Sequence, residues 1–300
     1  MDRKGILYGI GAYGLWGLFP IYWKLLHSIS ALQLIGHRIG WSFLLLMVVI
    51  FVTKQWQDFR SVALTPKTLG IYAIAGILLS INWLIYVWAV NAGYIVETSL
   101  GYFINPLLSM LMGVIFLRER LRPAQWIPVA LAAIGVSYLT YIYGRLPWIA
   151  LALAFTFGIY GLVKKIAPLG SLYGLTLETG ILFLPALIYL LFVESNGTGA
   201  FLHTGLVAGL LMIGAGAVTT IPLLMFASAA QRIPLTMIGV LQYIAPTLQF
   251  LIGVLVYKEP FDRDHFIGFS IVWVALIVFW VENFMAHRVP VQPVAEMGEG

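Results

Sequence analysis

Four ionisable side chains fall within or at the edge of stretches that are otherwise almost wholly apolar: His37, Arg38, Glu97 and Glu178. A charged side chain at the centre of a bilayer costs about 2.5–3.5 kcal/mol on insertion scales, so it needs a partner or a water-filled cavity. Two kinds of chemistry meet that need. Arg38 can form a buried ion pair with Glu178 or Glu97, or a carboxylate or His37 can bind and release protons.

These side chains differ in the chemistry that they favour. For Arg38 we expect the buried ion pair. For Glu178 and His37, a structural role and proton coupling both remain open. Glu97 has a further alternative, because the helix dipole stabilises a negative charge at the start of a helix.

Polar, aromatic and small residues recur at helical spacing along the same apolar stretches. Two matching stripes at i, i+4, i+7 and i+11 consist of Tyr102, Pro106, Ser109 and Gly113, and of Gln242, Pro246, Gln249 and Gly253. Such stripes are typical of a cavity wall between helices, although close helix packing uses similar residues. From these and neighbouring stripes, we expect eight residues to contact a solute: Trp16, Asn82, Tyr86, Tyr102, Asn105, Tyr160, Gln242 and Tyr243. Aromatic rings with small polar groups suit an amphipathic solute better than a bare ion.

Five prolines lie well inside the apolar stretches: Pro20, Pro106, Pro185, Pro222 and Pro246. Proline removes one intrahelical hydrogen bond and strains the preceding turn. Lipid cannot bond the freed carbonyl, so a neighbouring helix or cavity water must do so. We therefore expect a helix kink at each of these prolines.

The composition identifies the solvent that surrounds these residues. Of the 300 residues, 61% are apolar and 10% are charged, whereas soluble domains are roughly 25% charged. The apolar runs are unbroken and long enough to span a bilayer as helices, unlike the alternating strands of a barrel. We predict an all-α polytopic membrane protein with ten transmembrane helices, near 5–24, 33–52, 70–90, 95–117, 124–143, 147–163, 173–193, 204–228, 234–257 and 264–286.

The distribution of lysine and arginine predicts the orientation. If the N-terminus is cytoplasmic, most basic residues fall in cytoplasmic segments, so both termini are expected in the cytoplasm. The same distribution accounts for the net charge of +5 without a nucleic-acid partner. The absence of cysteine excludes disulfides and thiolate metal sites.

The chain contains an internal repeat. Pro106, Gly113 and Glu119 recur 140 positions later as Pro246, Gly253 and Glu259. Residues 1–144 are therefore expected to form a first five-helix repeat and residues 145–287 a second, inverted one, with a disordered tail at 288–300. Inverted repeats are a recurrent construction of secondary transporters.

Motifs for enzymatic chemistry are missing or misplaced. The sequence has no HExxH, GxSxG or Walker motif. Residues 9–14 match GxGxxG, but they lie inside the first apolar span and follow no strand. We therefore expect no enzyme, no cofactor and no metal.

Several segments resemble RarD-type permeases, which are bacterial members of the EamA family in the drug/metabolite transporter superfamily. The similarity is carried by AYGLWGLFPIYWKLL, GHRIGWSF, NWLIYVWAVNAG, ETSLGYFINPLLSMLMGVIFLRERL, VTTIPLLMFASAA and LQYIAPTLQFLIGVLVYKEPF. The resemblance implies ten helices in two inverted repeats of five and residence in the bacterial inner membrane. It also implies transport of small organic solutes, usually outward, in a family associated with chloramphenicol sensitivity. It assigns no site residue.

Together these observations predict a secondary active permease or exporter that works by alternating access. Its partners would be the lipid bilayer, a small organic solute and, if transport is coupled, protons; the oligomeric state is open. The alternatives are a lipid flippase or scramblase and a non-transporting component of a membrane assembly.

Overall fold

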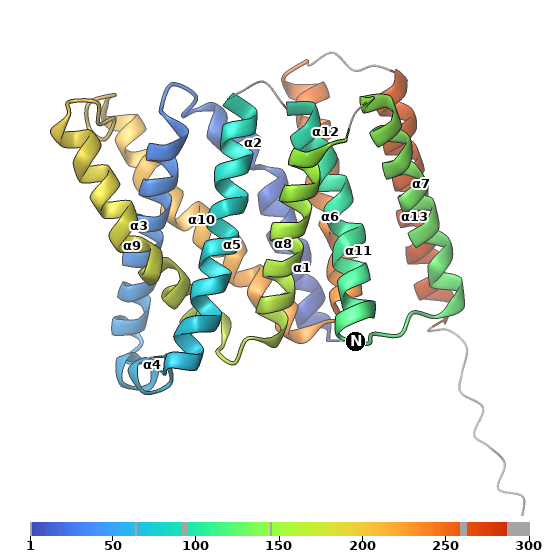
Figure 1. Ribbon diagram of the computed structural model, residues 1–300, viewed down its shortest axis with the longest axis horizontal. Coiled ribbons are helices and arrows are strands. Elements are labelled where there is room, and N and C mark those ends of the chain that lie inside the picture. Colours follow the sequence, from blue (N-terminus) through green and yellow to red (C-terminus); the bar gives the residue numbers. More distant parts are fainter. Residues whose placement is uncertain (1, 64, 92–94, 145, 259–262, 287–300) are drawn as a thin grey trace, which may run out of the picture. The chain divides into compact units, whose positions relative to one another are not determined.

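The computed structural model describes residues 2–63, 65–91, 95–144, 146–258 and 263–286, and these segments are helices joined by turns, with no strand among them (Figure 1). In chain order the elements are α1 (Arg3–Gly17), α2 (Phe19–Lys24), α3 (Ala31–Val52), α4 (Trp56–Ala63), α5 (Pro66–Asn91), α6 (Ile95–Phe116), the 3-10 turn η1 (Pro123–Gln125), α7 (Trp126–Tyr143), α8 (Trp148–Ile166), α9 (Ser171–Ser195), α10 (Leu206–Arg232), α11 (Leu235–Gln242), α12 (Ile244–Leu251), the π-helical turn η2 (Ile252–Val256) and α13 (Arg263–Ala286).

Six helical segments are long and apolar enough to cross a membrane: Ala31–Val52, Pro66–Tyr86, Pro123–Ile142, Trp148–Ile166, Ser171–Ser195 and Leu206–Arg232. Two further apolar helices, Gly101–Phe116 and Phe266–Phe279, are shorter. The prediction of a polytopic helical membrane protein is confirmed. The count of ten and the inverted arrangement stay predictions. The tail at 288–300 lies outside the described residues.

The chain packs as two compact units, Met1–Glu119 with Arg145–Pro260, and Arg120–Gly144 with Phe261–Gly300. In the second unit, α7 packs along α13. The Tyr138 hydroxyl donates to Asp264 Oδ1 at 3.2 Å, and Arg122 Nη2 lies 3.2 Å from Glu282 Oε2. These units are defined by contacts between helices. The predicted boundaries at 144 and 287 are defined by the internal sequence repeat, which these contacts do not test.

Within the first unit, each long helix packs against at least two others. Helix α3 contacts α9 and α10, α8 contacts α5 and α6, and α6 also contacts α11. The approach of α3 to α10 depends on Gly216, since a Cβ there would lie 2.6 Å from the Trp41 carbonyl carbon and 2.9 Å from Ser42 N. The Ser42 hydroxyl donates to Gly216 O at 3.1 Å across this contact. Close approach at a small residue is how membrane helices gain packing energy.

Two of the expected spans are divided into two helices. The span expected at 5–24 is interrupted at Leu18, and the span expected at 234–257 is interrupted at Tyr243. In the first case Pro20 lacks the N–H that would bond the Trp16 carbonyl, and Gln249 Nε2 donates to this carbonyl at 3.1 Å instead. The amide of another helix thus satisfies the carbonyl that proline frees.

Three of the remaining four prolines lie inside continuous helices. Pro106, Pro185 and Pro222 are inside α6, α9 and α10. Pro246, like Pro20, lies in the first turn of the helix that follows a break. Proline is tolerated in that turn because its missing N–H has no intrahelical partner there. At Pro20 and Pro246 the prediction of a kink is therefore replaced by a break before the proline.

The spans predicted at 33–52 and 70–90 leave residues 53–69 as a connection between them, but part of this connection is helical. Helix α4 buries Phe59 and Ala63 one turn apart, and they pack in a cluster with Ile50, Tyr72 and Leu177. Buried apolar residues at i, i+4 opposite charged and polar residues are typical of an amphipathic helix.

Candidate functional site

A central cavity of about 80 Å³ lies among helices of the first unit. Its lining residues come from α1, α2, α5, α6, α8, α10, α11 and α12: Tyr13, Trp16, Phe19, Leu79, Asn82, Trp83, Tyr86, Thr98, Gly101, Tyr102, Asn105, Leu153, Phe157, Leu223, Gln242, Ala245, Pro246 and Gln249. The space is large enough for several waters. Its wall combines aromatic rings with amide side chains, which is the composition of a site for a small organic molecule.

The structure brings together six of the eight residues predicted to contact a solute: Trp16, Asn82, Tyr86, Tyr102, Asn105 and Gln242. The rings of Tyr86 and Tyr102 meet edge to face with their centroids 5.8 Å apart. Trp16 makes similar contacts with Tyr13 at 5.3 Å and Phe157 at 5.9 Å. Such pairs hold each ring in one orientation, so the aromatic wall is ordered without a ligand. Solute contact itself stays a prediction.

Tyr160 and Tyr243 do not line this cavity, which corrects their predicted placement. Tyr243 follows Gln242 directly, and one helical residue is a rotation of about 100°, so its side chain turns away. Its hydroxyl donates to Phe103 O at 3.5 Å. Tyr160 is fully buried and donates its hydroxyl hydrogen to Glu178 Oε2 at 3.2 Å. The hydroxyl groups of both tyrosines thus bond to other parts of the protein and do not face the central cavity.

The amides of the cavity wall differ in how they are used. Asn82 Nδ2 donates to Leu153 O at 2.8 Å and to Thr156 Oγ1 at 2.9 Å, so this nitrogen fastens α5 to α8. In contrast, Asn105 Oδ1 is buried and has no hydrogen-bond partner among the described residues, whereas the Gln242 amide lies beside the Tyr13 hydroxyl, with which it can form a hydrogen bond. A buried acceptor without a partner is costly, and a ligand or water in the cavity would bond to it.

A second cavity, of about 50 Å³, adjoins the first and shares Leu79, Trp83 and Leu223 with it. Arg38 and Glu178 both line the second cavity. The Arg38 guanidinium lies 3.5 Å from the centre of the Trp83 ring and 5.0 Å from that of Trp23. Its Nε donates to Thr219 Oγ1 at 2.8 Å. Among the described residues no carboxylate lies within ion-pair distance of it.

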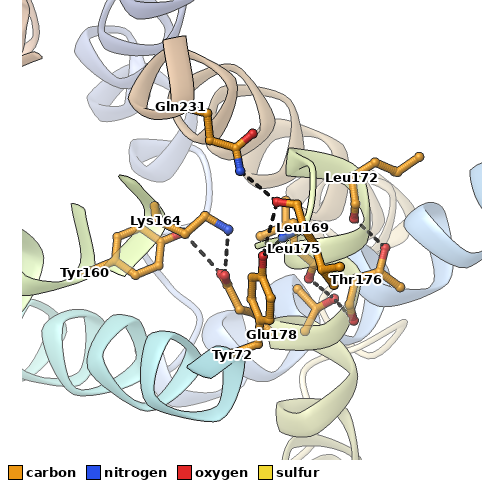
Figure 2. Close-up of polar contacts among 10 residues, drawn as sticks. Tyr72, Tyr160, Lys164, Leu169, Leu172, Leu175, Thr176, Glu178 and Gln231 are labelled. Atoms are coloured by element: carbon orange, nitrogen blue, oxygen red, sulfur yellow. Dashed lines mark hydrogen bonds and ion pairs between the residues drawn. The ribbon is translucent and has the colours of Figure 1, made fainter. Parts of the chain in front are cut away.

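Glu178 instead pairs with Lys164, as Figure 2 shows. Lys164 Nζ lies 2.6 Å from Glu178 Oε1, and each of the two side chains is 1% exposed. Tyr160 bonds the other carboxylate oxygen. The expected pairing of Glu178 with Arg38 is therefore wrong, because a lysine on α8 occupies the carboxylate.

The turn between α8 and α9 is hydrogen-bonded to two other helices near this ion pair. Tyr72 donates its hydroxyl hydrogen to Leu169 O at 3.2 Å and accepts from Leu169 N at 3.0 Å. Gln231 Nε2 donates to the same carbonyl at 2.7 Å (Figure 2). The Tyr72 ring also lies 5.4 Å from Lys164 Nζ. Helices α5 and α10 thus hold the turn that follows Lys164.

Lys164 is the site residue that sequence reasoning missed. Its position near the end of an apolar span made it resemble a cytoplasmic lysine. The signal was helical spacing, because Thr156, Tyr160 and Lys164 follow one another at i, i+4 and i+8 and so share a face.

Of the other two candidates for coupling, the structure places His37 away from Glu178. His37 is buried against Phe201, with 5.0 Å between ring centroids, and lines a separate groove that also contains Glu194 and His203. In that groove His203 Nε2 lies 2.7 Å from Glu194 Oε1. The side chain of Glu97 lies outside the part of the chain that the structure describes.

Comparison with known proteins places these features in a family. Residues 3–141 match the EamA-like transporter family. Protein RarD of Streptomyces exfoliatus is 46% identical over 277 residues, which cover 92% of this chain and 88% of the relative. The uncharacterized transporter YojE of Bacillus subtilis (strain 168) is 46% identical over 289 residues, 92% of this chain and 93% of the relative. Protein RarD of Escherichia coli (strain K12) is 40% identical over 286 residues, 95% and 97% of the two chains.

A solved crystal structure has the same fold. It superposes with a TM-score of 0.70 over 96% of this chain and 100% of the other, at 21% sequence identity. At that identity the likeness concerns the fold alone.

Proposed function

The chain belongs to the EamA-like transporter family, and from this premise we propose that it is a secondary active permease for small organic solutes of the bacterial inner membrane. It would move the solute by alternating access, with both termini in the cytoplasm, and export is the direction that the resemblance to RarD-type permeases implies. The observation that carries the proposal is the central cavity, whose wall places among aromatic rings the Asn105 amide oxygen, which has no partner among the described residues. This combination suits an amphipathic solute.

The helix contacts support an inverted repeat of two five-helix halves. In this repeat α1 and α2 correspond to α8, α3 to α9, α5 to α10, α6 to α11 and α12, and α7 to α13. The helix contacts then occur in matching pairs. The contact of α1 with α10 matches that of α8 with α5, and the contact of α3 with α10 matches that of α9 with α5. Three contacts join corresponding helices: α3 with α9, α6 with α11, and α7 with α13. A pseudo-two-fold arrangement of this kind allows two quasi-equivalent halves to exchange open states.

Alternating access needs contacts that close one end and break when it opens. Glu119, just beyond α6, accepts hydrogen bonds from Leu235 N at 2.7 Å and Thr236 N at 2.9 Å. It thereby caps the first turn of α11 and ties the end of α6 to it. Charge-assisted bonds to the N-terminus of a helix are strong and depend on geometry, so we propose that these two bonds break when the halves move apart.

If transport is coupled to protons, Glu178 is the better candidate than His37. Glu178 lines a cavity that adjoins the central one, whereas His37 lines a separate groove. Protonation of Glu178 would remove the charge that holds Lys164, and the pair would then separate as the state changes.

The proposal is tested with purified protein in liposomes loaded with a bacterial metabolite extract and a few amphipathic antibiotics. Mass spectrometry measures which solutes leave, with and without an imposed pH gradient. Loss of particular solutes that depends on the protein is expected. Loss that grows with the gradient would support coupling, and Glu178→Gln would then abolish the dependence on the gradient.

A matched pair of variants identifies the cavity as the route. Asn105→Ala removes an amide that faces the cavity and is expected to slow transport about tenfold, as expected for a lost buried hydrogen bond. Asn196→Ala changes an exposed asparagine after α9 and should have no effect. Equal rates for the two variants would contradict transport through this cavity. If no solute leaves and labelled lipid crosses between leaflets, the protein is a scramblase.

A further inference from the structure

The second cavity contains a buried cation whose terminal donors are unused. Arg38 is 6% exposed, and within the described residues only its Nε donates a hydrogen bond, to Thr219. The indole rings of Trp83 and Trp23 lie against the guanidinium. Rings stabilise a cation through their faces and leave the in-plane N–H donors free. The donors of the two Nη atoms therefore need an acceptor that the described chain does not supply.

The neighbours of Arg38 are hydroxyl groups. Tyr102, Tyr86 and Tyr22 are the titratable side chains that interact electrostatically with the guanidinium. The Tyr22 hydroxyl is used, because it donates to Leu211 O. Tyr86 and Tyr102 line the central cavity, and Trp83 lines both cavities. Arg38 is thus surrounded by neutral donors and rings, which do not balance its charge.

A second polar group in this cavity also lacks a partner. Thr220 is 2% exposed, and its Oγ1 has no hydrogen-bond partner among the described residues. It lines the same cavity as Arg38. Two groups that line one cavity and can donate hydrogen bonds, one of them charged, together favour an anion.

The carboxylate of Glu178 in the same cavity does not cancel this charge. It is paired with Lys164 at 2.6 Å. Of the three charged groups, Arg38 and Lys164 are positive and Glu178 is negative, which leaves one positive charge. A single carboxylate would neutralise it.

We propose that the second cavity is an anion subsite, in which Arg38 and Thr220 bind the carboxylate of a transported solute. This inference rests on the proposed function. The planar guanidinium matches a carboxylate with two parallel hydrogen bonds. The body of the solute extends past Trp83 into the central cavity, where aromatic rings contact it. The substrate class is therefore a small organic acid with an aromatic or otherwise apolar body.

Binding of matched probes to the wild-type protein tests the subsite directly. Thermal unfolding is measured in phenylacetate and in phenylacetamide, which share one shape and differ in charge. Phenylacetate is expected to bind roughly 10- to 100-fold more tightly, as a charge-assisted hydrogen bond predicts. Equal binding of the two probes, or tighter binding of the amide, would overturn the inference. Sodium chloride in place of sucrose at the same osmolality is the arm for inorganic anions: stabilisation by chloride without any by phenylacetate would also overturn it.

Variants then assign the effect to these residues. Arg38→Gln is expected to abolish the preference for phenylacetate, Arg38→Lys to keep part of it, and Thr220→Val to reduce it several-fold. Arg232→Gln is the control, because Arg232 is exposed and pairs with Asp2 at 3.3 Å. If Arg38→Gln does not fold, Arg38→Lys and Thr220→Val decide, and an unchanged preference in both contradicts the assignment.

The liposome experiment separates failure of the subsite from failure of the proposed function. Export of carboxylates that Arg38→Gln loses, and Arg232→Gln keeps, supports both. Export of only neutral or cationic solutes, or carboxylate export that Arg38→Gln leaves unchanged, overturns the subsite and keeps the permease. If the wild-type protein exports no solute, the proposed function fails, and the thermal-unfolding result then decides separately whether Arg38 binds a carboxylate.

Discussion

Two buried cations of this protein, Lys164 and Arg38, differ in what neutralises them. Lys164 is 1% exposed and has a carboxylate 2.6 Å away, whereas Arg38 is 6% exposed and is surrounded by indole rings and hydroxyl groups. An ion pair that is already complete stabilises one arrangement of helices. A cation without a counter-ion is costly to bury, and binding of an anion removes that cost. The comparison therefore separates an ion pair that is complete without a ligand from a site prepared for one.

Breaking the ion pair should give the largest effect. Glu178→Leu leaves Lys164 as an unpaired buried charge, so the free energy of unfolding is expected to fall by about 3–5 kcal/mol. Lys164→Met leaves Glu178 unpaired and should have a similar effect. Reversible unfolding in mixed detergent micelles measures both.

The double variant Lys164→Met/Glu178→Leu provides the control. Replacement of both charges by apolar side chains is often neutral, so most of the lost stability should return. If the double variant is as unstable as the sum of the two single variants, the pair is not coupled and the assignment of a complete ion pair is wrong.

Removing the acceptor that the described residues supply to Arg38 should have the next largest effect. Thr219→Val leaves the Nε donor of a charged group without its partner, at an expected cost of about 1.5–3 kcal/mol in the free energy of unfolding. Thr179→Val is the control. Thr179 lines the same cavity, but its hydroxyl bonds only to carbonyls of its own helix. A cost for Thr179→Val as large as that for Thr219→Val would show that the bond to Arg38 is not special.

The sequence predicts the membrane class from its composition, the family from a resemblance of several segments, and most of the cavity wall from periodicity. Tyr102 and Asn105 lie on one face of a helix by their spacing alone, and the structure places both in the central cavity. The failures concern direction and pairing. Gln242 and Tyr243 are adjacent, and only the break at Tyr243 fixes which of them faces the cavity.

Pairing between helices cannot be read from spacing. Glu178 and Arg38 line one cavity, but Glu178 forms its ion pair with Lys164 and not with Arg38 as predicted. Which cation reaches a carboxylate depends on how α3, α8 and α9 pack, and that packing is set by contacts such as the one at Gly216. Helix α4 was missed for a related reason, since its apolar face is only two residues long.

The close contact at Gly216 provides a test specific to the Arg38 site. In Gly216→Ala the new Cβ would overlap the backbone of α3, which cannot move without the helix. Overpacking of this kind costs about 1–3 kcal/mol, and the displaced α3 should weaken the bond between Arg38 and Thr219. Gly40→Ala on α3 is the control, because a Cβ there meets open space. Thermal unfolding measures stability, and a Gly216→Ala variant as stable as Gly40→Ala would contradict the close approach of α3 and α10.

The smallest expected effect distinguishes two roles of Tyr72 beside the ion pair. Tyr72→Phe keeps the ring 5.4 Å from Lys164 Nζ and removes both hydrogen bonds to Leu169. Leu169 O keeps its bond from Gln231, so we expect a loss of about 1 kcal/mol and faster hydrogen exchange at the Leu169 amide. Tyr72→Leu removes the ring as well. If it costs no more than Tyr72→Phe, the ring contributes nothing to the ion pair, and the tyrosine acts only on the turn after α8. A larger cost for Tyr72→Leu would mean that the complete ion pair includes an aromatic wall, as the Arg38 site does, and that only the counter-ion distinguishes the two sites.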